Sequence, residues 1–226
     1  MSAHKLRLHG LDLAGVAAGA LLLATGAGVA LWGEASAVYP VHYGLDGIAD
    51  RWGERGEIAA FAAVMGLATI LSTVGMGWWA GRAADSARAR GLRVAQALSL
   101  IAFSVVGALF VCVGVARQES IGAAVPMAAL SVLFIAIGAL TGRVAPNPIV
   151  GVRTPWSYKS RLAWDRSNRL AGRLFLLIGV AGLIAAAWAP QPAGVIGLVV
   201  AVVVAALWAV VESWRVWRSD PDRQPF

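Results

Sequence analysis

The sequence PNPIVGVRTPW, residues 146–156, is the polar segment around which the rest of this chain is arranged. Asn147 and Arg153 offer directional hydrogen bonds between prolines that fix the backbone, and Gly151 permits a close approach or a positive φ. Four long apolar runs precede this segment and two follow it. On residue chemistry alone, the segment is either a functional loop or a plain polar connector between helices.

The composition is that of a membrane protein. Hydrophobic residues make up 59% of the chain and charged residues 14%, whereas soluble domains are about one quarter charged. The 226 residues accommodate about six spans of some 20 residues with short connections, so we expect one integral membrane domain. Cys112 is the single cysteine and lies in an apolar run, which excludes an intrachain disulfide, a thiolate metal site and redox chemistry.

The apolar runs predict six transmembrane helices in an all-α polytopic bundle. Their approximate spans are residues 11–33, 58–80, 94–116, 121–141, 170–189 and 193–211. The first could instead be a signal peptide, since Ala35-Ser36-Ala37 resembles a cleavage site. Its apolar run exceeds the roughly 7–15 residues of a signal-peptide core, which favours a retained helix.

The basic residues predict the orientation. The N-terminal side of the predicted topology carries 16 of them, beginning with Lys5 and Arg7, and the other side carries only Arg51, Arg55 and Arg117. We therefore expect a multi-pass protein of the cell membrane. The positive-inside rule places both termini and the loop at 143–169 in the cytoplasm, and the loop at 34–57 outside the cell. The net charge of +7 reflects this topology, and we expect no direct contact with nucleic acid.

The outer loop contains three side chains of types that ligate metals, His42, Asp46 and Asp50. Their spacing of four would align them on a helix. Gly44 and Gly47 interrupt any such helix. We therefore favour a turn packed on the helix ends, with His42 hydrogen-bonded, and a metal site is the alternative.

The segment from Ser157 to Arg173 predicts a short interfacial helix before the fifth span. On a helical wheel, four basic residues fall within an arc of about 80°: Lys159, Arg166, Arg169 and Arg173. The opposite side carries Trp156, Ala163, Trp164, Ala171 and Leu174. Arg161 lies off the arc. The basic edge would meet anionic lipid or an acidic protein, and a plain anchor at the lipid headgroups is the simpler interpretation.

Several function classes are disfavoured by what the sequence lacks. The middles of the six predicted spans contain no Asp, Glu, Lys, Arg or His, which ion-coupled carriers and proton relays usually need at depth. The chain contains no phosphate-binding glycine loop, zinc motif or nucleophile–base pair. We expect no catalytic site, metal or cofactor.

Two motifs carry a resemblance to a known family. The order N-x-x-x-G-x-R-T-P-W at 147–156, followed by Trp164 and Gly172, resembles the SdpI family of bacterial membrane proteins. The order P-x-H-x-G-x-x-G-x-x-D-R-W-G at 40–53 resembles the short N-terminal module, of unknown function, that often accompanies it. Together the two motifs cover roughly a fifth of the chain.

The resemblance implies an immunity protein that gives resistance to a secreted, membrane-active toxin peptide and also holds a transcriptional repressor at the membrane. The residues that it places toward the toxin are His42, Gly44, Asp46, Gly47, Asp50, Arg51 and Trp52. Those that it places toward the cytoplasmic partner are Asn147, Gly151, Arg153, Thr154, Pro155, Trp156, Lys159, Trp164, Arg166, Asn168 and Arg169.

Two other functions stay open at this point. One is a membrane-embedded, metal-dependent enzyme acting on a peptide or lipid through His42, Asp46 and Asp50. The other is a small permease or lipid-binding scaffold with a polar cavity between helices.

Overall fold

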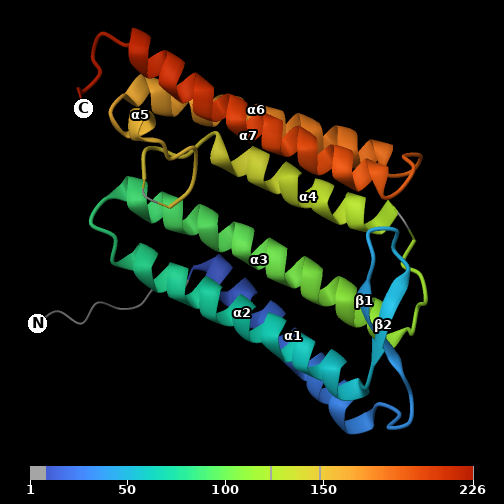
Figure 1. Ribbon diagram of the computed structural model, residues 1–226. Coiled ribbons are helices and arrows are strands. Elements are labelled where there is room, and N and C mark those ends of the chain that lie inside the picture. Colours follow the sequence, from blue (N-terminus) through green and yellow to red (C-terminus); the bar gives the residue numbers. More distant parts are fainter. Residues whose placement is uncertain (1–8, 123, 148, 226) are drawn as a thin grey trace, which may run out of the picture.

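The computed structural model describes residues 9–122, 124–147 and 149–225. Within these residues six helices are long and apolar enough to cross a membrane, which confirms the predicted all-α polytopic bundle (Figure 1). The six are α1 (Gly10–Trp32), α2 (Arg55–Gly81), α3 (Ser86–Val115), α4 (Ala124–Thr141), α6 (Arg161–Ala185) and α7 (Ala193–Ser219). The other elements are β1 (Tyr39–Tyr43), β2 (Ala49–Gly53) and the short α5 (Pro155–Tyr158).

The spanning helices form two groups of three, α1–α2–α3 and α4–α6–α7, which face each other across α3 and α4. Small residues set the spacing within each group, because lipid supplies no hydrophobic drive and helices associate by close packing. A Cβ on Gly19 of α1 would lie 2.6 Å from the carbonyl oxygen of Gly66 on α2. In the other group, a Cβ on Gly138 of α4 would lie 2.7 Å from the carbonyl oxygen of Gly172 on α6.

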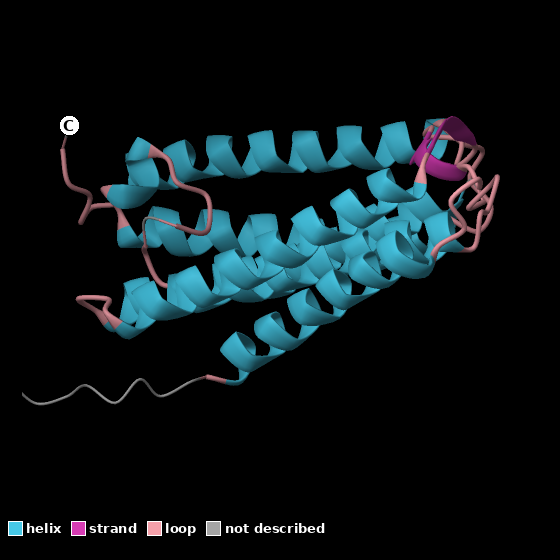
Figure 2. Ribbon diagram, turned by 90° about the horizontal axis from the view of Figure 1, so that it is seen from below, coloured by secondary structure: helices cyan, strands magenta, loops and turns pink. Residues whose placement is uncertain are grey.

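The two ends of the bundle differ in what they carry. One end, here the motif end, holds the α2–α3 connection, the segment 142–160 and the C-terminus; the hairpin end holds β1, β2 and the α3–α4 and α6–α7 connections (Figures 1 and 2). All described lysines and arginines except Arg51, Arg55 and Arg117 lie in the half nearer the motif end. Lys5 and Arg7 lie outside the described residues. This distribution is the one that the positive-inside rule associates with a cytoplasmic motif end, and the orientation itself stays a prediction.

The outer loop forms a β-hairpin where the sequence predicts only a turn. Strands β1 and β2 pair antiparallel, with register shifts on both sides of His42. Tyr39 and Val41 of β1 are buried against Ile58 at the start of α2, so the hairpin is fixed to the helix ends. Gly47, at the turn, has a φ of 77° that suits glycine.

The segment expected as an interfacial helix is divided. The short helix before the fifth span is α5, which ends at Tyr158, and α6 begins at Arg161 and continues to Ala185 without a break. Most of the basic segment therefore belongs to the first turns of the spanning helix itself. Trp164 and Asn168 consequently lie inside the bundle, where both are buried.

Candidate functional site

Asn147 organises the loop at the motif end. Its Oδ1 accepts hydrogen bonds from the backbone N–H groups of Ile149 and Val150, both at 2.8 Å. Its Nδ2 donates to the carbonyl oxygens of Ala145 and Val150 at 2.9 and 3.1 Å. The residue is 3% exposed. Because the amide is buried and bonded at both ends, Asn147 shapes the loop, and its predicted contact with a partner stays a prediction.

The same side chain connects the two helix groups. A Cβ added to Gly91 of α3 would lie 2.5 Å from Oδ1 of Asn147, so the loop rests directly on the α3 backbone. The loop follows α4, which belongs to the other group. Asn147 therefore fixes the motif end of α3 relative to α4.

Asn168 holds the second half of the loop. Its Oδ1 accepts a hydrogen bond from the Val152 N–H at 2.6 Å, and its Nδ2 donates to the Trp164 carbonyl oxygen at 3.0 Å. Gly151 has a φ of 120°, and a Cβ there would lie 2.4 Å from Asn168 Oδ1. Glycine is thus required both by the backbone angle and by the space.

Trp164 packs beneath the motif loop, inside the bundle. Its indole is fully buried, and Nε1 donates to the Val144 carbonyl oxygen at 2.9 Å. A buried indole that has a hydrogen-bond acceptor combines a large packing surface with a fixed orientation. Together with Asn147, Asn168 and Gly151, it makes the polar motif a structural brace.

Thr154 joins the loop to α5 and α7. Its hydroxyl accepts from the Ser157 N–H at 3.1 Å, and Ser157 Oγ accepts from the Thr154 N–H at 3.0 Å, which is a capping box. The Thr154 and Ser213 hydroxyls are 2.8 Å apart, which links α5 to α7. Pro155 occupies the first turn of α5, where its missing N–H costs nothing.

The C-terminal tail is bound to the same region. Ser160, which caps α6, donates to Asp220 Oδ2 at 2.5 Å. This hydroxyl and the Asp222 N–H hold the pKa of the Asp220 carboxyl below its usual value. The Gln224 N–H donates to the Lys159 carbonyl oxygen at 2.8 Å, and Lys159 Nζ donates to the Pro225 carbonyl oxygen at 2.6 Å.

The remaining predicted residues of the motif end are accessible. Arg153 and Pro155 are exposed, and Trp156 and Lys159 are half-buried. On α6, the basic face consists of three exposed side chains, Arg166, Arg169 and Arg173, and Arg161 is exposed at its side. Asp165 lies 3.3 Å from Arg161 Nε and 3.8 Å from Arg169 Nη2, so one carboxylate partly neutralises this face.

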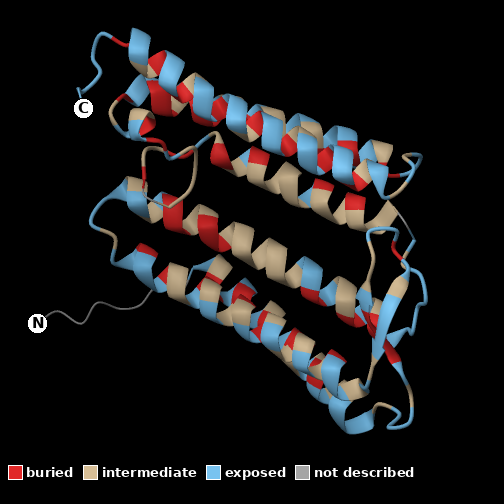
Figure 3. Ribbon diagram, viewed as in Figure 1, coloured by how far each residue is buried: buried red, intermediate tan, exposed pale blue. Residues whose placement is uncertain are grey.

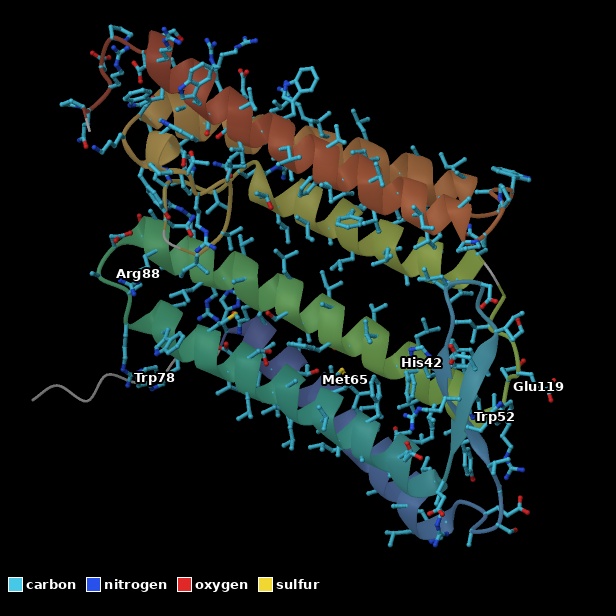
Figure 4. The ribbon with its side chains drawn as sticks, in the orientation of Figure 1. His42, Trp52, Met65, Trp78, Arg88 and Glu119 are labelled. Atoms are coloured by element: carbon cyan, nitrogen blue, oxygen red, sulfur yellow. The ribbon has the colours of Figure 1, made fainter. Side chains whose placement is uncertain are left out.

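The hairpin presents the second predicted set of residues. His42 Nδ1 and Asp50 Oδ1 are 2.5 Å apart across the two strands, and Arg51 Nη1 is 2.7 Å from Glu57 Oε2. Trp52 is 41% exposed beside them (Figure 4). The predicted hydrogen bond of His42 is therefore present, but its partner comes from the opposite strand and not from a helical turn.

Asp46 has a local role in the hairpin turn. Its Oδ1 accepts from the Ile48 N–H at 3.1 Å, and a Cβ on Gly44 would lie 2.7 Å from the same atom. Within residues 9–122, 124–147 and 149–225, no three His, Cys, Asp or Glu side chains are grouped so as to hold a metal ion. The strand conformation removes the helical alignment on which the metal alternative depended.

The hairpin is tied to the α3–α4 connection. The Ala49 N–H donates to the Glu119 carbonyl oxygen and the Ile121 N–H donates to the Gly47 carbonyl oxygen, both at 2.9 Å. Tyr43 Oη donates to the Gln118 carbonyl oxygen at 2.8 Å, and burial raises the pKa of its phenol. An isolated two-stranded hairpin is marginal in water, so these bonds keep its outer face in a fixed position.

A further ion pair joins the α1–β1 connection to the end of α3. Arg117 Nη2 is 2.7 Å from Glu34 Oε2. The hydrogen bond and the positive charge of Arg117 lower the pKa of Glu34. The hairpin is thus bound on both sides to the helix ends that surround it.

Residues 143–212 match the SdpI/YfhL protein family. About a third of the chain is thus similar to this family. The matched region begins in the motif loop and includes α5, α6 and most of α7. It therefore contains the four residues of the brace, Asn147, Gly151, Trp164 and Asn168, and ends one residue before Ser213.

Residues 19–66 match a domain of unknown function (DUF1648). That region contains both strands of the hairpin and the helix halves that flank it. No curated protein and no solved structure matches the chain. The SdpI family is not a known enzyme family.

Sequence reasoning missed a polar group that joins α1, α2 and α3. Asp12 of α1 is buried, and its Oδ1 accepts from Arg93 Nη1 at 2.9 Å and Gln96 Nε2 at 2.6 Å, both on α3. The Gln96 amide also donates to the Thr73 carbonyl oxygen on α2 at 2.9 Å. The signal was present, since Asp12 and Gln96 stand in the first turns of the predicted spans 11–33 and 94–116 and Arg93 directly precedes the second of these, but local pattern does not pair residues of different spans.

Proposed function

We propose that this protein protects its cell against a secreted, membrane-active peptide, which it meets at the hairpin end. The family supports an immunity-type membrane protein. The observation that carries the proposal is the anchored hairpin, on which His42, Arg51 and Trp52 are exposed. It supplies an aromatic anchor beside polar groups of both signs, which is the composition of binding hot spots.

The anchoring of the hairpin strengthens this proposal. Its backbone is bonded to the α3–α4 connection and β1 is buried on the helix ends. A preorganised surface loses little conformational entropy on binding. A peptide arriving from outside would meet this surface before it reached the hydrocarbon region.

The test uses a sensitive cell that expresses the protein and is challenged with the peptide fraction secreted by the source organism. Membrane potential, followed with a dye, reports protection. Trp52→Ala and His42→Ala should lower protection at unchanged protein abundance. The matched control is Trp188→Ala, because Trp188 is 78% exposed and lies at the same end but outside the hairpin. Full protection by the two hairpin variants would contradict the proposal.

The basic face of α6 favours a second role, the capture of a cytoplasmic repressor. Arg166 and Arg169 point away from the bundle, and Lys159 lies at the preceding turn. An acidic partner would be attracted over about 8 Å at physiological ionic strength. The brace beneath keeps the start of α6 in place, so the charges form a fixed pattern.

Charge reversal tests this second role separately. Lys159→Glu, Arg166→Glu and Arg169→Glu together should release the candidate repressor from the membrane fraction while protection from the peptide persists. Arg88→Glu and Arg90→Glu at the same end are the matched control, since both side chains are exposed on α3 (Figure 4 labels Arg88). If the control variant releases the candidate repressor equally, the effect is one of net charge alone. If the α6 variant still retains the repressor at the membrane, the repressor-binding role is refuted.

A further inference from the structure

A crevice separates α3 from α4 in the half of the bundle nearer the hairpin. Its volume is about 200 Å³. The α3 wall contains Ile101, Ala102, Val105, Val106, Leu109, Phe110 and Val113. The α4 wall contains Ala129, Leu130, Val132 and Leu133, and Tyr43 and Ile121 complete the lining. Figure 3 shows much of α3 and α4 as only partly buried, in keeping with a gap between the two helix groups.

The crevice lies at the depth of one leaflet. The α3 wall runs from Ile101 to Val113, two residues before the helix ends at Val115. At 1.5 Å per residue this wall is about 18 Å long, close to the roughly 15 Å that half of a bilayer core measures. Tyr43 and Ile121 belong to the hairpin and to the α3–α4 connection, so the polar headgroup level lies at that end.

The chemistry of the walls selects an apolar occupant. Tyr43 is the one polar side chain among the described lining residues, and its hydroxyl is already bonded to the Gln118 carbonyl oxygen. Such walls offer a water molecule none of the several hydrogen bonds that it needs. An empty gap would forfeit dispersion contacts along both walls.

The shape of the crevice excludes a helical peptide. A helix with side chains is about 10–12 Å across, and it would have to enter between α3 and α4, which contact each other directly. The two helix groups are also fixed to each other at the motif end, where Asn147 rests on Gly91. A single flexible chain fits without separating them.

We propose that this crevice binds one acyl chain of a phospholipid from the leaflet at the hairpin end, with the headgroup beside the hairpin. This site is independent of the peptide and repressor roles proposed above. Its ligand would complete the packing between the two helix groups where the protein's own side chains leave it open.

The test uses the full chain reconstituted in phosphatidylcholine vesicles that contain a fraction of phosphatidylcholine with a diazirine in the middle of one acyl chain. After illumination, mass spectrometry maps the labelled residues. Labelling of the two crevice walls should exceed labelling at Leu71, which is 69% exposed on α2 and lies outside the crevice. This comparison needs no variant, so it does not depend on how substitutions fold.

Substitutions then fill the crevice from either wall. Ala102→Phe and Ala129→Phe should each lower wall labelling at least fivefold, whereas Ala108→Phe, on an exposed part of α3 outside the lining, should leave it unchanged. Wall labelling equal to that of Leu71 would show ordinary surrounding lipid and overturn the proposal. Displacement of the label by the secreted peptide fraction, with no loss in either Phe variant, would assign the crevice to a peptide and also overturn it.

Discussion

Replacing Asn168 by alanine should destabilise the motif end through two lost hydrogen bonds. The Val152 N–H would lose its acceptor, which at 2.6 Å is a short contact, and an unsatisfied, partly buried donor costs about 1–3 kcal/mol. Loss of the bond from Nδ2 to the Trp164 carbonyl oxygen adds about 0.5–1.5 kcal/mol. We therefore expect the free energy of unfolding to fall by about 2–3 kcal/mol, as measured by denaturation in mixed detergent micelles.

The contact with Gly151 makes this prediction more specific. Gly151→Ala alone should cost about 1–3 kcal/mol from its φ of 120°, and more from the Cβ placed 2.4 Å from Asn168 Oδ1. In the Asn168→Ala background that oxygen is absent. The double variant should therefore lose about 1 kcal/mol less stability than the sum of the losses of the two single variants. Arg166→Ala, exposed on the same helix, is the control and should stay within about 0.5 kcal/mol of wild type. Additive losses, or an Asn168→Ala variant as stable as the control, would refute the brace.

Three further substitutions test other contacts. Asp12→Ala should cost about 2–3 kcal/mol in the same unfolding assay. This is less than the loss expected when one partner of a fully buried ion pair is removed, because Arg93 keeps 25% of its side chain exposed. A loss under about 0.5 kcal/mol would contradict the prediction. The Ser160 hydroxyl lowers the folded-state pKa of Asp220, so the carboxylate stabilises the fold above its unfolded pKa and loses this contribution as the pH falls through the folded pKa. Asp220→Asn should therefore flatten the acid limb of a plot of stability against pH. An unchanged acid limb would argue against this contact. Arg153→Lys should lower protection almost as far as Arg153→Ala, because a lysine cannot reproduce the planar guanidinium fork, and full protection by the Lys variant would leave only a charge requirement.

The spanning helices and the sides of α6 could be predicted from the sequence, because both follow from periodicity and length. Apolar runs of about 20 residues leave no alternative to spanning helices at this composition. The wheel over Ser157–Arg173 correctly opposed the exposed arginines to Ala163, Trp164 and Ala171, which are buried. The start of α6 was missed because its first turns contain five charged residues before Leu174, and such a segment resembles an interfacial helix.

The hairpin and the brace could not be predicted in the same way, since both depend on long-range contacts. Pro40, Gly44 and Gly47 in the outer loop indicate turns, and the strands are only five residues each. Their stability comes from bonds to Gln118 and Glu119, far away in the sequence. The pairing of Asn168 with the Val152 backbone is equally invisible to local pattern. Several of the residues predicted to bind a partner make these contacts and hold the loop in place, and their binding of a partner stays a prediction.

Both proposed roles depend on a hairpin that faces outward and a motif end that faces the cytoplasm, and labelling of whole cells tests this directly. Asp46→Cys and Arg166→Cys, each in a Cys112→Ala background, place a thiol on exposed positions at the two ends. A membrane-impermeant maleimide added to intact cells should label the cysteine at position 46 and should reach the one at position 166 only after the cells are lysed. Labelling of position 166 in intact cells, with position 46 protected until lysis, would contradict the account.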